Sequence, residues 1–185
     1  TGVSQSEIEL KANIQLYDKI PAYDMHELLI KSASELISDN TPNYQFVAAR
    51  LISYKIRKEV YGQYEPWGLK RLVAKNIKRG VYDRSILDKY SESELDQLNN
   101  YIKHDRDDNF TYAGMEQFRG KYLVQERSTK TLYESPQMLY MMVAATLFAD
   151  ETKDRLAWVK SYYDAISTFY ISLPTPIMAG VRTPT

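Results

Sequence analysis

Few side chains in this sequence have the types and spacings that chemistry needs. The 185 residues contain no cysteine and two histidines, His26 and His104. Without cysteine the chain holds no disulfide, no cysteine–zinc site and no thiol nucleophile. A glycine-rich phosphate loop, a His-Glu-x-x-His zinc motif and a Gly-x-Ser-x-Gly nucleophile elbow are also missing from the sequence. The sequence therefore predicts no catalytic residue and no metal ligand of its own.

Three groups of polar side chains remain as candidates. His26 stands beside Glu27 near an expected helix start, where a surface or capping role is the commoner one. The charged run 104–108 (HDRDD) alternates in sign, which favours a solvated helix end with locally paired charges over a metal or acid–base cluster. The third group is Tyr162, Tyr163 and Tyr170. Tyrosines at helical spacing more often pack against a core than carry a radical or stack on a ligand.

A turn near the C-terminus is a fourth candidate. Pro174 and Pro176 fix the backbone on both sides of Thr175. A turn held in this way can present a hydroxyl and backbone donors to an anion. Turns with proline are also common without any function, so both interpretations stay open on local pattern alone.

Capping residues and apolar spacings typical of helices occur along most of the sequence, so we expect helices to position these candidate residues. Three helices are expected before residue 62, and Gly62 should end the third. Ile14 should lie on the apolar face of the first, which extends to Leu16. The expected starts are two capping boxes and one N-cap before proline: Ser4 with Glu7, Asp24 with Glu27, and Thr41.

The second part of the chain adds further helices and one hairpin. Helices are expected over 69–78, 91–102, 110–118, 136–149 and 152–166. Two short β-prone runs, 122–124 and 131–133, predict the hairpin. Two prolines and a glycine predict a strand or extended loop over 171–180. The expected fold class is mainly α, with one β-hairpin and an extended tail.

Charge and hydropathy exclude several partner classes. Acidic and basic residues number 24 each, so the formal net charge is zero and offers no electrostatic grip on nucleic acid or an anionic membrane. The longest apolar run, 138–149, is shorter than the about 20 residues that a membrane span needs. The first ten residues are polar and do not resemble a signal peptide. We therefore expect a cytoplasmic protein.

Six segments resemble the large subunit of class I ribonucleoside-diphosphate reductases, and they occur in the family's order along nearly the whole chain. They are 44–51 (YQFVAARL), 61–66 (YGQYEP), 121–125 (KYLVQ), 132–135 (LYES), 163–168 (YDAIST) and 171–185 (ISLPTPIMAGVRTPT). Such runs in register are more specific than a lone short motif. The likeness is to the class Ia enzymes of bacteria and T4-like phages.

The resemblance implies a division into three parts. Residues 1–61 would be the helical part of a truncated ATP-cone, the regulatory domain of the family. Residues 62–170 would be the helical N-terminal domain, and residues 171–185 would enter the first strand of a ten-stranded α/β barrel. The family's cone begins upstream of Thr1 and its cysteines follow Thr185. The chain is therefore expected to be an N-terminal fragment of the catalytic subunit, inactive alone.

The resemblance also implies an activity. The family reduces ribonucleoside diphosphates to 2′-deoxyribonucleoside diphosphates for DNA synthesis, by thiyl-radical chemistry. ATP and dATP would be effectors of the full subunit, and the radical cofactor would lie in the small subunit, with no cofactor bound directly by this chain. The implied partners are the rest of the large subunit, the small subunit, thioredoxin or glutaredoxin, and the diphosphate substrate, with neither nucleic acid nor membrane among them.

Three site residues follow from the resemblance. Thr175 corresponds to the family's threonine at the substrate diphosphate. Lys58 corresponds to a lysine of the ATP-cone nucleotide pocket, and His26 to a position lining that pocket. Ala22 departs from the family, because the bacterial pattern has an effector-contacting threonine there. With part of its cone missing, the chain alone is expected to bind dATP weakly or not at all.

Two other interpretations remain. The chain could be a non-catalytic helical regulatory or interaction module that kept the fold without the barrel. A fragment would leave an apolar edge strand exposed over 171–178, whereas an evolved module would cover or polarise it. An unrelated all-α enzyme that uses the 104–108 cluster has little support.

Overall fold

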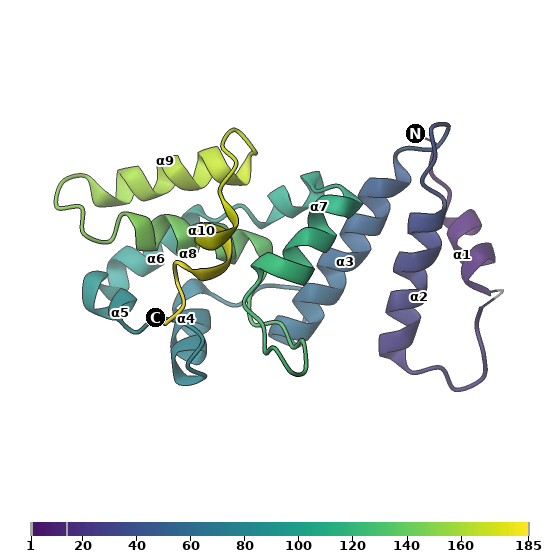
Figure 1. The fold of residues 1–185 in the computed structure, drawn as a ribbon, viewed down its shortest axis with the longest axis horizontal. Helices are drawn as coiled ribbons and strands as arrows, with labels where there is room; N and C mark the ends of the chain where they lie inside the picture. The colour runs from purple at the N-terminus through teal and green to yellow at the C-terminus, as the bar shows by residue number, and fades with distance from the viewer. Residues whose placement is uncertain (1, 14, 185) are drawn as a thin grey trace.

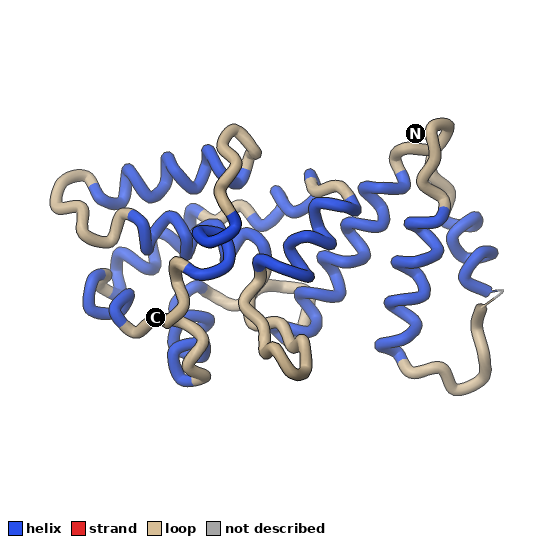
Figure 2. Tube along the Cα trace, in the orientation of Figure 1, coloured by secondary structure: helices blue, strands red, loops and turns tan. Residues whose placement is uncertain are grey.

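A computed structural model describes residues 2–13 and 15–184, which form an elongated array of helices (Figure 1). Thr1, Ile14 and Thr185 lie outside the described residues, and with them the expected place of Ile14 on the first helix. Helices joined by loops make up the described part of the chain, which has no strand (Figure 2). The expected mainly α fold class is confirmed.

Along residues 2–13 and 15–184, the helices range from 5 to 18 residues in length. Two of them are not α-helices: η1 is a 3-10 helix, and η2 is one turn of π-helix that continues α7. In chain order the elements are α1 (Gln5–Asn13), α2 (Ala22–Glu35), α3 (Tyr44–Tyr61), α4 (Leu69–Lys78), α5 (Ser85–Lys89), α6 (Glu92–Tyr101), η1 (His104–Asn109), α7 (Tyr112–Gln117), η2 (Phe118–Tyr122), α8 (Pro136–Leu147), α9 (Arg155–Ser167) and α10 (Thr175–Gly180).

Helix α8 is the centre of the larger group of helices. Every residue from Pro136 to Ala145 is buried, as the apolar sequence of this segment predicts. The proline stands in the first turn, where its missing N–H has no helical partner to lose. Helices α9 and α10 and the η1 segment pack around α8. In the part of the chain described here, no helix is both long and apolar enough to cross a membrane.

Helix α3 joins the two ends of the array. It packs against α2 on one side and against α7 and η1 on the other. Polar side chains, Ser53, Lys55 and Arg57, are buried along it. Gly62 ends the helix with a φ of 73°, a left-handed conformation that glycine adopts without steric cost. The expected end of this helix is confirmed.

The first helix is shorter than expected. It ends at Asn13, so Leu16 falls in the following loop and is 41% exposed. Leu10 is 67% exposed, although its spacing placed it on an apolar face. The Glu7 carboxylate accepts the Tyr44 hydroxyl of α3. The α1 helix is therefore held by a few polar contacts more than by a buried stripe.

Capping residues give a mixed result. The capping box of Ser91 and Glu94 at the start of α6 is confirmed. The start expected at Asp24 is wrong, because α2 already begins after Pro21, whose fixed φ opens the helix earlier. The start expected at Thr41 is also wrong. Its hydroxyl donates to a carbonyl of the preceding loop at 2.7 Å, and α3 begins later.

The hairpin expected around residues 122–133 is reduced to one antiparallel bridge between Gln125 and Leu132. A longer ladder does not form because the Val124 N–H donates to the Glu134 side chain at 2.8 Å. The chain then enters α8 directly. The predicted turn between the two β-prone runs is present, but the runs 122–124 and 131–133 do not form strands.

The strand or extended loop expected over 171–180 is present only as a loop over 171–174, and it is wrong for 175–180, where α10 forms. Pro174 is its N-cap in an extended conformation, with φ −67° and ψ 150°, and Pro176 stands in the first turn, where proline is tolerated. Met178 of this helix is buried. Ile171 remains 44% exposed in the preceding loop. The tail thus covers part of its apolar surface and leaves part open.

Candidate functional site

His26, Tyr54 and Lys58 come together where α2 packs against α3. The His26 and Tyr54 ring centroids are 5.3 Å apart, and Lys58 Nζ lies 6.0 Å from the Tyr54 centroid. Tyr64, just past the Gly62 turn, stacks on Tyr54 with 5.7 Å between ring centroids. The two residues expected at an effector pocket therefore flank one ring. We call His26, Tyr54, Lys58 and Tyr64 the α2–α3 cluster.

The α2–α3 cluster combines aromatic faces with a cation. This combination suits a flat ring that carries a negative group. His26 is half-buried and Lys58 is exposed, so solvent reaches both. Ala22 precedes His26 by one turn of α2 and lies on the same helix face. Ala22 carries a methyl group where the bacterial pattern has a threonine hydroxyl. This difference from the family pattern therefore lies beside the α2–α3 cluster.

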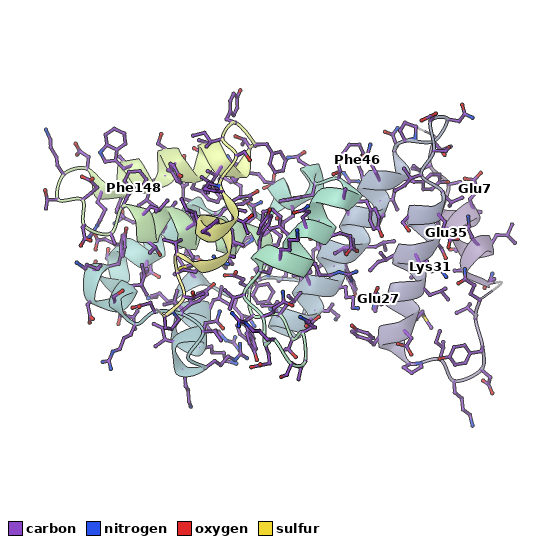
Figure 3. All side chains as sticks on the ribbon, viewed as in Figure 1. Glu7, Glu27, Lys31, Glu35, Phe46 and Phe148 are labelled. Carbon is purple, nitrogen blue, oxygen red and sulfur yellow. The ribbon has the colours of Figure 1, made fainter. Side chains whose placement is uncertain are left out.

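Glu27, next to His26, ties α2 to two other segments. Its Oε1 accepts from Lys55 of α3 and, at 2.7 Å, from Arg119 of η2. The Glu27 side chain lies on the side of α2 that faces α3 (Figure 3). Partial burial opposes ionisation, but the hydrogen bonds and charges of Lys55 and Arg119 lower the pKa of Glu27. With Tyr23, these side chains line a cavity of about 410 Å³.

The charged run 104–108 is a solvated helix end only in part, since Asp105 and Asp108 are exposed. It forms η1, and Asp107 within it is fully buried. The Asp107 carboxylate accepts from Gln137 at 2.9 Å and from Arg57 at 3.3 Å. Burial raises the pKa of Asp107 to about 6, although these two partners favour the ionised form. Sign alternation predicted local pairing, but the central carboxylate pairs with α3 and α8 instead.

His104 is part of the same packing. Its carbonyl accepts from Arg57 at 2.8 Å. Burial and the Arg57 charge lower the pKa of His104 to about 4, so the imidazole is neutral near pH 7. Arg106 pairs with Asp164 of α9 at 2.7 Å. Over the described residues, no group of three or more histidine or acidic side chains could hold a metal ion.

The three candidate tyrosines differ from one another. Tyr163 is buried and donates to Gln137 Oε1 at 2.7 Å, so the packing interpretation is confirmed for it. Tyr162 is half-buried, as expected. Tyr170 is 88% exposed, and the packing interpretation is wrong for it. Helix α9 ends at Ser167, so helical spacing no longer applies to Tyr170.

Thr175 begins α10 and is exposed between its two prolines. The Pro174 carbonyl accepts from Ile177 N at 3.1 Å and from Met178 N at 3.2 Å, which closes the turn from within. Helix α10 lies across the molecule from α2 (Figure 1). The structure therefore separates the expected substrate residue from the expected effector residues.

A buried ion pair joins the tail to the loop before α8. Arg182 and Glu134 are both 0% exposed at their side chains. Arg182 Nε donates to the two Glu134 oxygens at 3.1 Å and 2.9 Å. Glu134 also accepts the Tyr82 hydroxyl and the Val124 N–H. Burial and the Glu134 charge raise the pKa of Tyr82 well above its usual value.

Sequence reasoning missed the roles of Glu27, Glu134 and Arg182. Glu27 follows Asp24 by three residues, which is the spacing of a capping box. Glu134 and Arg182 each stand alone among uncharged neighbours. Charged side chains are almost never fully buried unless they are paired. Two isolated charges in otherwise uncharged segments are therefore the signal that could have marked a buried pair.

Comparison with known proteins places the chain in a family. Residues 108–185 match the family described as ribonucleotide reductase, all-alpha domain. Over 185 residues the chain is 52% identical to ribonucleoside-diphosphate reductase 1 subunit alpha of Escherichia coli. The aligned region covers 100% of this chain and 24% of that protein. It is 45% identical to ribonucleoside-diphosphate reductase subunit alpha of Enterobacteria phage T4, covering 100% of this chain and 25% of that protein.

The likeness extends to more distant members. Ribonucleoside-diphosphate reductase subunit alpha of Helicobacter pylori is 32% identical over 98% of this chain, with 22% of that protein covered. The chain spans about a quarter of the length of the curated relatives that it matches. Matches of this identity along the whole sequence show that the chain belongs to the ribonucleoside-diphosphate reductase alpha-subunit family.

Proposed function

We propose that these residues act within an alpha subunit that reduces ribonucleoside diphosphates to their 2′-deoxy forms by thiyl-radical chemistry. The observation that carries this proposal is the 52% identity to the Escherichia coli alpha subunit over the whole chain. Because the 185 residues hold no cysteine, the radical cysteine and the reducing cysteine pair would belong to other parts of the subunit. The small radical-generating subunit and thioredoxin or glutaredoxin would be its partners, in the cytoplasm.

The proposed division of labour follows the chain. Residues 1–61 would serve as the helical part of an ATP-cone, residues 62–170 as the helical N-terminal domain, and residues 171–185 as the approach to the barrel. The left-handed turn at Gly62 supports the first boundary, because it ends α3 and redirects the chain. The all-alpha family match extends to residue 185 and so includes the proposed approach to the barrel.

The α2–α3 cluster is the proposed contact for ATP or dATP. Lys58 would pair with a phosphate, and His26 would line the pocket beside the Tyr54 ring. The support is their convergence on one ring from two helices. No hydroxyl is available at Ala22, so the pocket would contact its effector with fewer donors than the bacterial pattern provides.

Thr175 is the proposed contact for the substrate diphosphate. Its side chain is exposed at a turn that two prolines fix. Among the described residues the Thr175 hydroxyl has no hydrogen-bond partner, so it is available to an incoming phosphate oxygen.

The effector assignment is tested by Lys58→Met in the complete alpha subunit. Loss of one hydrogen bond to a charged group should weaken ATP and dATP binding about tenfold or more. Lys75→Met is the matched control, because Lys75 Nζ also lies over an aromatic ring, at 4.3 Å from Trp67, but belongs to α4. Equal dissociation constants for the two variants by calorimetry would remove Lys58 from the site.

The substrate assignment is tested by Thr175→Val in the same subunit, assayed with its small subunit. The Michaelis constant for the diphosphate should rise about tenfold, while effector binding stays unchanged. Thr168→Val is the control, since its hydroxyl donates to the carbonyl of Asp164 within its own helix. An unchanged Michaelis constant in Thr175→Val would overturn the assignment.

A further inference from the structure

We propose that Arg182 is a positioning residue for the substrate-diphosphate turn, and that it acts on Thr175 through the backbone of α10. The inference rests on the proposed function of Thr175. Arg182 would not touch the substrate, since its side chain is fully buried.

The guanidinium of Arg182 joins three segments of the chain. Nη1 donates to the Met178 carbonyl of α10 at 2.7 Å, and Nη2 donates to the Tyr122 carbonyl of η2 at 2.9 Å. Nε and Nη2 donate to Glu134 before α8. Donors in a planar fork fix direction as well as distance. Arg182 therefore sets the orientation of α10 relative to η2 and to the start of α8.

Met178 transmits this orientation to the turn. Its carbonyl accepts from Arg182, while its N–H donates to the Pro174 carbonyl at 3.2 Å. Pro174 directly precedes Thr175, and its ring and that of Pro176 fix φ on both sides. A shift of the Met178 carbonyl would therefore move the Thr175 hydroxyl.

Arg182 itself is held at both its backbone and its side chain. Asp83 N donates to the Arg182 carbonyl at 3.0 Å. The adjacent Tyr82 hydroxyl donates to Glu134, the partner of the guanidinium. A binding group needs support of this kind to stay within about 0.5 Å of its productive position. The loop after α4 thus completes the frame on which the turn rests.

Stability alone is a poor explanation for this arrangement. Buried ion pairs can often be replaced by apolar side chains of similar volume without loss of stability. The Met178 and Tyr122 carbonyls, however, need donors that an apolar side chain lacks. We infer that the buried arginine fixes the direction of α10 through these hydrogen bonds.

A double-mutant cycle in the complete alpha subunit, assayed with its small subunit, tests the proposal. Arg182→Lys keeps a positive charge for Glu134 but loses the fork that also reaches Met178. The diphosphate Michaelis constant should rise about tenfold, because misplacement of a binding group by about 1 Å is costly. In Arg182→Lys combined with Thr175→Val, the constant should be no higher than in the worse single variant, because both act on one contact.

Three results separate the possibilities. A lower melting temperature with an unchanged Michaelis constant in Arg182→Lys, or effects that multiply in the double variant, would overturn the positioning role. An unchanged constant in Thr175→Val alone would instead overturn the proposed function of Thr175. Arg155→Lys is the control, since Arg155 also bonds one carboxylate and one carbonyl, and it should leave the constant unchanged.

A milder variant covers the case in which Arg182→Lys does not fold. Tyr82→Phe removes one donor to Glu134 and preserves the ring that fills the core. It should raise the Michaelis constant in the same direction by a smaller factor. It should also speed hydrogen exchange of the amides in α10 more than in α8. Unchanged values of both quantities in Tyr82→Phe would overturn the proposal.

Discussion

Helix α8 and helix α1 stand at opposite extremes of burial in one chain. Ten of the 12 residues of α8 are buried, whereas Ala12 is the buried residue among those described in α1. Their surroundings differ in the same way. The side chains of the Glu134–Arg182 pair beside α8 are 0% exposed. Figure 3 labels Lys31 and Glu35 on α2. Their side chains are 61% and 39% exposed.

The difference separates two tasks that helices can perform. Helices packed on all sides hold a turn such as that of Thr175 in one place. Sparsely buried helices such as α1 and α2 present side chains to solvent, and here they bring His26 toward Lys58. Most helical stability in proteins comes from tertiary packing. The N-terminal helices should therefore depend on the packing of α2 against α3, to which Glu27 adds a polar tie to α3 and η2.

The largest effect that would test this comparison is expected from Glu134→Ala. The change leaves Arg182 charged and buried without its carboxylate, which costs about 3–5 kcal/mol of unfolding free energy. Glu27→Ala is the counterpart at the other end, where the side chain is 37% exposed. It should cost about 1–3 kcal/mol, because Glu27 is partly solvated but its partner Lys55 is only 8% exposed. Urea unfolding measures both, and equal losses would contradict the contrast.

Core truncation gives the next largest effect. Met141→Ala in α8 opens a cavity at a fully buried position and should cost about 2–5 kcal/mol. Leu10→Ala in α1 removes a side chain that is 67% exposed. It should change stability by about 0.5 kcal/mol or less. A large loss in Leu10→Ala would show that α1 is covered in solution.

A pH dependence sharpens the contrast inside the core. The pKa of Asp107 is raised to about 6, so the folded chain keeps a proton that the unfolded chain releases, and this contribution to stability falls as pH rises from about 4 to 6. The pKa of His104 is lowered to about 4. The unfolded chain therefore binds a proton that the folded chain lacks, and this contribution rises from about pH 4 to 6.5.

His104→Leu should uncover the Asp107 titration. In the unmodified chain the two contributions oppose each other between about pH 4 and 6. Without His104, the unfolding free energy should fall as pH rises. Its slope against pH should be lower than that of the unmodified chain by up to about 1.4 kcal/mol per pH unit. Urea unfolding at several pH values in this window checks it. Parallel pH profiles for the two proteins would show that His104 ionises when folded.

The smallest expected effect is that of Glu27→Gln. The amide keeps an acceptor but loses the charge shared by Lys55 and Arg119, so the cost should be about 1 kcal/mol or less. Hydrogen exchange should accelerate in α2 and remain unchanged in α8, because local opening follows local packing. Glu35→Gln is the control on the same helix, because its partners Lys11 and Lys31 are 34% and 61% exposed. Equal hydrogen-exchange rates of the α2 amides in the two variants would contradict the role of Glu27 in holding α2 to α3 and η2.

Most of the helical layout could be predicted from local signals. The box of Ser91 and Glu94, the end at Gly62 and the proline-led start of α8 each depend on residues within one turn, and all three are confirmed. The predictions failed where two local signals competed. At α2 the fixed φ of Pro21 started the helix ahead of Asp24.

The candidate site could be predicted only through the family resemblance. His26 and Lys58 lie on different helices, and no spacing rule brings them to one ring. The buried pair of Glu134 and Arg182 spans 48 residues. Local pattern does not predict contacts of that range, and it does not predict the burial of Asp107 in the charged run 104–108 either. Side-chain pairing between distant segments is the information that the sequence pattern lacks.

The same span has a consequence for how the protein is made. Glu134 leaves the ribosome 48 residues ahead of Arg182. Synthesis at about 5–20 residues per second separates the two by roughly 2–10 s. During that interval the carboxylate stays hydrated or protonated, and α8, translated directly after it, cannot complete its packing around a bare charge. The segment that carries Arg182 therefore allows this core to close only some seconds after α8 has been made.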